Sequence, residues 1–168
     1  MKQRRLGKHG PMISPIGIGA MSFSNFYGQT SEADSHAILN TALDEGVTHI
    51  DTADIYGPLT SEEVIGSFLA RQGSQRNDMF SIATKAGIAR DADTGKRYFD
   101  NSAAYLESRL DASLTRLGVD HVDLFYVHRR DADTPIEEVA DTLAALVKSG
   151  KTRSFGFSEI APASLRCA

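Results

Sequence analysis

The alternation of short apolar segments with amphipathic segments is the feature that most restricts how this chain can fold. Five apolar segments that predict strands begin near residues 16, 47, 79, 121 and 153. Segments with helical periodicity follow them, at residues 30–45, 60–69, 102–117, 134–149 and 161–168. Such alternation is typical of parallel strands with helices packed outside the sheet.

Two parallel architectures are compatible with this pattern. One is an open, doubly wound sheet, and the other is a closed (β/α)8 barrel of the TIM type, which needs about 250 residues. The chain has 168 residues, so as a barrel it would contain about five β/α units. We predict an α/β fold with a single domain over residues 1–168. It would comprise an N-terminal β-hairpin in 1–15 and the β/α units in 16–168, with the last helix truncated.

Two capping motifs and one long loop add local detail. Thr60 with Glu63, and Thr134 with Glu137, fit capping boxes, in which a hydroxyl caps the helix and a glutamate reaches back to it. We also assign Glu62, which precedes Glu63, to helix capping. Residues 85–101 are polar and form a loop whose length is typical of lids and binding loops.

Charge and composition exclude several classes of function. The net charge is −4 with both signs interspersed, which gives no basic stripe for nucleic acid. No stretch approaches the roughly 18 apolar residues of a membrane span, and the N-terminus has no apolar signal-peptide core. Cys167 is the single cysteine, which favours a reducing compartment. We therefore expect a cytoplasmic protein that binds neither nucleic acid nor membrane.

Four chemically active side chains stand where predicted strands end. Asp51 and Tyr56 follow the second strand, Lys85 follows the third and His128 follows the fourth. Because active sites on parallel sheets lie at the carboxyl ends of the strands, we expect these four side chains to meet.

Together these four groups are suited to moving a proton. A free phenol has a pKa of about 10, so Tyr56 needs help to act near neutral pH. An ammonium from Lys85 would favour the phenolate, Asp51 would hold that ammonium, and His128 would orient a carbonyl oxygen. The reaction would be reduction of an aldehyde or ketone, with hydride supplied by a cofactor, since no side chain donates hydride.

The chain resembles the aldo-keto reductase family over essentially its whole length, as roughly the first half of a full-length member. The resemblance is carried by these motifs: Gly17-Ile18-Gly19-Ala20-Met21, Ile50-Asp51-Thr52-Ala53-Asp54-Ile55-Tyr56-Gly57, Glu62-Glu63-Val64-Ile65-Gly66, Ala83-Thr84-Lys85, Ser108-Arg109-Leu110, Leu114-Thr115-Arg116-Leu117-Gly118, Asp120-His121-Val122-Asp123-Leu124, His128, and Gly150-Lys151-Thr152-Arg153-Ser154-Phe155-Gly156-Phe157-Ser158.

The resemblance implies a TIM-type barrel, NADPH as cofactor and a small-molecule carbonyl substrate. The implied catalytic residues are Tyr56 as general acid, with Asp51, Lys85 and His128. The implied cofactor contacts are Gly19, Ala20, Met21, Asp51, Ser158 and Glu159. Glu159 stands where the family usually has asparagine, and the segments that grip the adenosine phosphates are expected beyond residue 168.

Several alternatives remain open for individual residues. Taken singly, each of the four active side chains has an ordinary structural explanation, and only their coincidence at strand ends favours catalysis. A metal site through His49, Asp51 and His128 is disfavoured because the histidines lack close-spaced partners, so no metal is expected. The pair Arg129-Arg130 is interpreted as a solvated rim, and His9 and His36 as surface residues.

Other functions compete with carbonyl reduction. One is Schiff-base chemistry at Lys85. Another is a regulatory nicotinamide-binding subunit, and a third is an inactive fragment of a reductase. If the sheet is part of a barrel, its first and fifth strands are open edges that invite self-association.

Overall fold

A five-stranded parallel sheet forms the centre of the molecule. The computed structural model describes residues 1–8, 10–57, 59–73 and 78–168. The strands are β3 (Ile18–Gly19), β4 (His49–Asp51), β5 (Ser81–Ala86), β8 (Leu124–Val127) and β9 (Phe155–Phe157), and they neighbour each other in chain order. A doubly wound sheet would reverse direction at a switch point, whereas this sheet does not. The structure is therefore a partial barrel-like α/β fold, as predicted.

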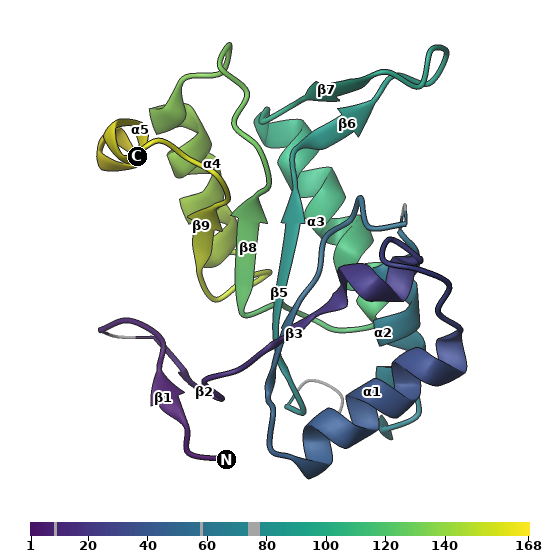
Figure 1. The fold of residues 1–168 in the computed structure, drawn as a ribbon. Coiled ribbons are helices and arrows are strands. Elements are labelled where there is room, and N and C mark those ends of the chain that lie inside the picture. The colour runs from purple at the N-terminus through teal and green to yellow at the C-terminus, as the bar shows by residue number, and fades with distance from the viewer. Residues whose placement is uncertain (9, 58, 74–77) are drawn as a thin grey trace.

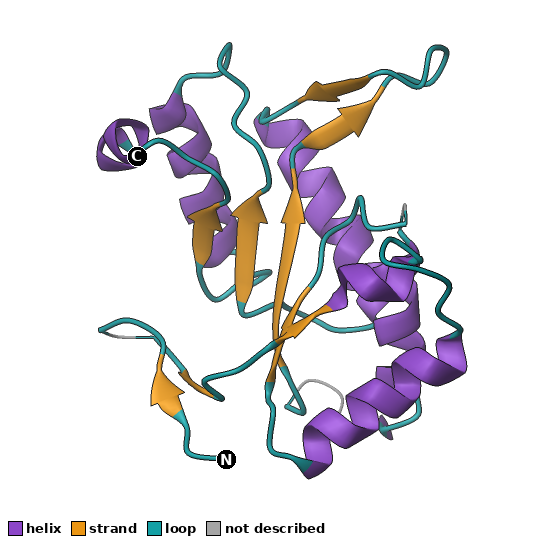
Figure 2. Cartoon of the chain, in the orientation of Figure 1, coloured by secondary structure: helices purple, strands orange, loops and turns teal. Residues whose placement is uncertain are grey.

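The helices lie between the strands in sequence and outside them in space. They are α1 (Glu32–Asp44), α2 (Thr60–Ala70), α3 (Ala103–Leu117), α4 (Ile136–Lys148) and the short α5 (Pro162–Cys167). Figure 1 shows α3 behind β5 and α4 behind β9, and the face of these strands toward the viewer carries no α-helix (Figures 1 and 2). The outer strands are β3 and β9.

An N-terminal hairpin lies at the end of the sheet where the strands begin. Its strands, β1 (Arg4–Arg5) and β2 (Met12–Ile13), pair antiparallel. The Ser14 N–H donates to the Thr48 hydroxyl at 3.2 Å, and the Thr48 N–H donates to the Ser14 hydroxyl at 2.9 Å. These bonds tie the hairpin to the segment that enters β4, far from the carboxyl ends of the strands.

Two segments outside the main sheet and the α-helices contain regular structure. Residues 20–29 include a 3-10 helix, η1 (Ala20–Ser24). The long polar loop after β5 contains a second hairpin, made of β6 (Ile88–Arg90) and β7 (Arg97–Phe99). In α1 a capping box does form, between Ser31 and Asp34.

The two predicted capping boxes are wrong. At α2 the N-cap residue is Leu59, and the Thr60 hydroxyl instead donates to the Gly57 carbonyl at 2.7 Å. At α4 the N-cap residue is Pro135, and the Thr134 hydroxyl donates to an Asp131 carboxylate oxygen at 2.7 Å. In both cases the threonine hydroxyl donates to the turn that precedes the helix, and no side chain caps the helix at its N-cap residue.

Glu62 is buried rather than engaged in capping. Its side chain is fully buried, and it accepts hydrogen bonds from the Thr84 hydroxyl and from Arg116 Nε, the latter at 2.8 Å. The bonds join α2 to α3 and to β5. His36, predicted on the surface, is also buried, with Nε2 3.0 Å from the Ser67 hydroxyl. His9 lies outside the described residues.

The α2 and α3 helices approach each other closely at Gly66. A Cβ atom placed on Gly66 would lie 1.9 Å from the Arg116 carbonyl oxygen. Around this contact lies the apolar core, whose largest fully buried members are Phe23, Phe68, Phe125, Leu39, Ile50, Ile65, Leu69, Leu106, Leu110, Leu117 and Leu143. The absence of a side chain at Gly66 thus sets the distance between the two helices.

We predict that Gly66→Ala lowers the free energy of unfolding by about 1–3 kcal/mol, although alanine favours helices, because the methyl group would force α2 and α3 apart. Urea denaturation followed by circular dichroism measures this. Ala70→Gly, at an exposed position of α2, is the control and should cost at most about 1 kcal/mol. A Gly66→Ala protein as stable as the original would contradict the prediction.

Candidate active site

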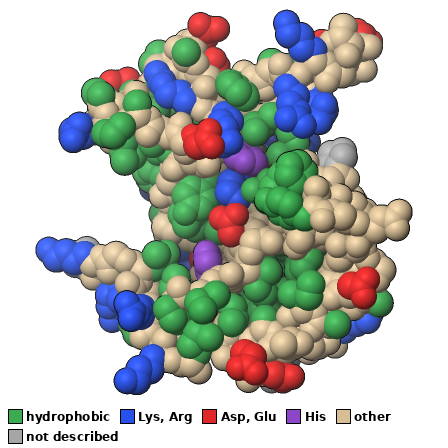
Figure 3. Space-filling view, viewed as in Figure 1, with side chains coloured by type: hydrophobic (Ala, Val, Ile, Leu, Met, Phe, Trp, Pro, Cys, Tyr) green, Lys and Arg blue, Asp and Glu red, His purple; other side chains and the backbone are tan. Residues whose placement is uncertain are grey.

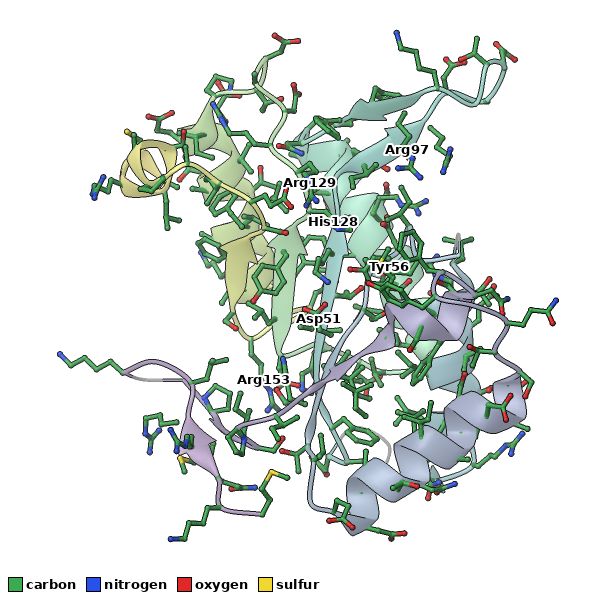
Figure 4. All side chains as sticks on the ribbon, viewed as in Figure 1. Asp51, Tyr56, Arg97, His128, Arg129 and Arg153 are labelled. Carbon is green, nitrogen blue, oxygen red and sulfur yellow. The ribbon has the colours of Figure 1, made fainter. Side chains whose placement is uncertain are left out.

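The four predicted catalytic side chains meet at one end of the sheet. Asp51 is the last residue of β4, Tyr56 lies in the loop that follows, Lys85 is the penultimate residue of β5 and His128 follows β8. These three strands are neighbours in the sheet. Figure 4 shows Asp51, Tyr56 and His128 along the middle of the open face.

The Lys85 ammonium is the centre of the cluster. It donates hydrogen bonds to Asp51 Oδ1, to the Thr52 carbonyl at 2.8 Å and to the Tyr56 hydroxyl at 3.3 Å. Lys85 lies inside β5, rather than after it as predicted, and is only 7 % exposed. An ammonium has three N–H donors, so these partners use all of them.

Tyr56 lies between the ammonium and the imidazole. Its ring centroid is 5.0 Å from Lys85 Nζ and 5.8 Å from the centroid of the His128 ring, which it meets edge-on. The Tyr56 side chain is half-buried, whereas Lys85 and His128 are buried. Tyr56 is therefore more accessible from the open face than Lys85 and His128 are.

His128 is held in its neutral form. Burial, together with the nearby charges of Lys85 and Arg129, lowers the pKa of His128 to about 4. Its Nδ1 atom is buried and has no hydrogen-bond partner in the described part of the chain. A neutral imidazole can donate one hydrogen bond and accept another, which suits it to hold a polar group of a ligand.

The residues predicted to touch a cofactor lie at the same end of the sheet. Gly19 is exposed and pairs with Asp51 across the β3–β4 ladder. In η1, Met21 is half-buried, while Ala20 is buried and its carbonyl accepts a hydrogen bond from the Ser61 hydroxyl at 2.8 Å.

The remaining two predicted cofactor contacts follow β9 and are joined to the cluster by an arginine. Arg129 donates to the Ser158 hydroxyl at 3.3 Å and pairs with the Glu159 carboxylate at 3.0 Å. Glu159 adopts a left-handed backbone conformation, with φ at 53°. Arg129 was interpreted as a solvated rim residue, but its side chain is only 31 % exposed.

Asp54 is a second buried carboxylate whose role the sequence did not reveal. It lies between Asp51 and Tyr56, is 1 % exposed and accepts a hydrogen bond from Arg109 Nε at 2.8 Å. The available signal was its position between two hydrophobic residues, Ala53 and Ile55.

The surface around the cluster is open and mixed in character. Figure 3 shows basic, acidic and histidine side chains together near the centre of this face, between hydrophobic patches. Across the described residues, no group of three or more His, Cys, Asp or Glu side chains is placed to hold a metal ion. Over the same residues, every helix is too short or too polar to cross a lipid bilayer.

Comparison with known proteins assigns the chain to one family. Residues 15–168 match the model of the aldo/keto reductase family. The chain therefore belongs to the aldo/keto reductase family.

Individual relatives agree with this assignment. The chain is 40% identical over 154 residues to yakc of Schizosaccharomyces pombe, named as an NADP(+) aldo-keto reductase, covering 92% of this chain and 45% of the relative. A probable aldo-keto reductase 1 of Glycine max is 34% identical over 163 residues, and the match covers 96% of this chain and 46% of the relative. The holo form of aldo-keto reductase AKR11C1 from Bacillus halodurans superimposes with a TM-score of 0.85 at 31% identity. That match covers 99% of this chain and 53% of the other. The chain thus spans about half the length of the relatives it matches.

We predict that the NMR signals of the His128 ring stay constant as the pH falls from 8 to about 5.5 and titrate with a midpoint near pH 4, because the pKa of His128 is lowered to about 4. Since Arg129 contributes to that shift, Arg129→Met should move the midpoint upward. A midpoint at or above pH 6 in the original protein would contradict the prediction.

Proposed function

We propose that this chain supplies the proton-transfer site of an NADPH-dependent oxidoreductase that reduces an aldehyde or ketone to an alcohol. The observation that carries the proposal is the buried Lys85 ammonium held against the Tyr56 hydroxyl. Membership of the aldo/keto reductase family supports it, as does the relative named for NADP(+).

In the proposed reaction, Tyr56 donates a proton to the carbonyl oxygen of the substrate. Lys85 stabilises the phenolate that remains, because a cation within hydrogen-bond distance favours the charged form of a phenol. Asp51 balances the charge of Lys85 and fixes its position. His128, being neutral, donates a hydrogen bond that orients the substrate oxygen before the transfer.

The end of the sheet near β3 fits a nicotinamide ring. Bound NADPH supplies the hydride that the substrate carbon receives. The space in front of Gly19 is open, since a Cβ placed there would meet nothing within 4 Å. Gly19, Ala20 and Met21 would then lie along the ring, and Ser158 would bind its carboxamide. Asp51 and Glu159 are the other proposed contacts.

Schiff-base chemistry at Lys85 is less compatible with the geometry. The nitrogen would have to give up three hydrogen bonds before it could attack a carbonyl. A nicotinamide-binding protein without turnover is the second candidate.

Self-association and location remain predictions. In the described sheet, β3 and β9 each have one neighbouring strand, so each presents an unpaired ladder to a second copy. Size-exclusion chromatography tests this interaction. The cytoplasmic location predicted from composition is tested by cell fractionation.

Tyr56→Phe should lower the turnover of NADPH with 4-nitrobenzaldehyde by about 10²–10⁴-fold, because the general acid is lost. Binding of NADPH, followed by its fluorescence, should stay within about twofold, since Phe keeps the ring. Tyr98→Phe removes a hydroxyl from the exposed β6–β7 hairpin and serves as the control.

Equal turnover in Tyr56→Phe and the original protein would exclude Tyr56 as the proton donor. NADPH binding by the original protein without any turnover would instead favour the second candidate.

A further inference from the structure

We propose that Asp54 is a positioning residue whose carboxylate, held by Arg109, fixes the Asp51–Tyr56 segment against Lys85 at the expense of fold stability. The inference rests on the proposed function of this site. Asp54 would act through its neighbours and would not touch substrate or cofactor.

The backbone of Asp54 joins the two halves of the catalytic cluster. Its N–H donates to the Lys85 carbonyl at 3.1 Å, and its own carbonyl accepts from the Leu59 N–H at 3.0 Å. Asp51 lies three residues before it and Tyr56 two residues after. A shift of Asp54 would therefore move both partners of the Lys85 ammonium.

The side chain of Asp54 anchors this segment to α3. Its Oδ2 accepts from Arg109 Nε at 2.8 Å, and the carboxylate is fully buried while the Arg109 side chain is 30% exposed. The anchor is a long-range contact, between residues 55 positions apart in the chain. The side chain thus holds the segment to α3, while the backbone N–H holds it to β5.

This anchor is costly to the fold. Asp54 Oδ1 is buried and has no hydrogen-bond partner among the described residues. A buried charge that is only partly compensated destabilises the folded state. In agreement, burial raises the pKa of Asp54 to about 6 against the opposing effect of Arg109.

The groups that face Asp54 determine this balance. Arg109, Arg116 and Tyr105 face it from α3 and Glu62 from α2. Arg90 and Tyr98 of the β6–β7 hairpin line the same cavity, of about 310 Å³. The two nearest cations favour the carboxylate, whereas Glu62 opposes it.

Glu62 provides a matched comparison. It is also a buried carboxylate paired with an arginine of α3, but both of its oxygens accept hydrogen bonds, from Thr84 and Arg116. It lies on α2, outside the Asp51–Tyr56 segment. The fully bonded pair Arg116–Glu62 and the proposed positioning pair Arg109–Asp54 therefore both use arginines of α3.

The test is Asp54→Asn, which keeps the shape of the side chain and removes its charge. Because the raised pKa of Asp54 means that the folded state prefers the protonated carboxyl, Asp54 favours folding below about pH 4, and this benefit is lost as the pH rises through about 6. At pH 7.5 the variant should therefore melt at the same or a higher temperature than the original protein, and the difference should disappear by pH 4.

The same variant should lose catalytic efficiency. We expect kcat for NADPH and 4-nitrobenzaldehyde to fall about tenfold or more, with KM within about twofold, because misplaced catalytic groups affect the transition state most. In the original protein we expect kcat to fall as the pH drops through about 6, where Asp54 becomes protonated, and this fall should be absent from the variant. Hydrogen exchange at the amides of residues 52–57 and 59 should be faster, and this readout needs no turnover.

Glu62→Gln is the control, and at pH 7.5 it should lower the melting temperature without faster exchange at residues 52–57 and 59. A parallel loss of melting temperature and kcat in Asp54→Asn would reduce Asp54 to a structural residue and overturn the proposal. Unchanged exchange at these residues would also overturn it. If the original protein shows no turnover, the proposed function fails, while the melting and exchange results still decide whether Asp54 positions the segment.

Discussion

The arrangement of this protein depends on placing a lysine ammonium inside a β-sheet. Lys85 is buried in β5, and a buried charge is tolerated only when it is paired and hydrogen-bonded. All of its partners come from the end of β4 and the loop after it. The need to pair the Lys85 ammonium therefore brings Asp51 and Tyr56 together. His128, which follows β8, lies beside them.

The α3 helix supports the cluster from behind. Arg109 and Arg116 are seven residues apart, which is two helical turns, so both lie on the same face of α3. One binds the carboxylate of Asp54 in the loop after β4, and the other binds the carboxylate of Glu62 in α2. Two charged contacts from one rigid helix thus locate both the loop and the helix that follows it.

The main features of fold and site were predictable from the sequence because they depend on short-range patterns. Strand–helix alternation predicted the sheet, and strand ends predicted the meeting of Asp51, Tyr56, Lys85 and His128. Other errors arose where a distant partner decides the outcome, whereas the two capping boxes failed on contacts three residues away in the chain. Glu62 was assigned to helix capping because its partner Arg116 lies 54 residues away. Similarly, no local pattern shows that Arg129 would contact Ser158 and Glu159 after β9.

The Asp51–Lys85 pair also has a consequence for how the sheet assembles. In the observed register Asp51 lies beside Ala83, and Lys85 follows two residues later on the same face. A slip of one residue between β4 and β5 would turn one of the two side chains to the opposite face. The ammonium would then be left in the interior without its carboxylate, at a cost of several kcal/mol. The residues proposed to carry the chemistry therefore also favour the observed register of β4 and β5 over shifted registers.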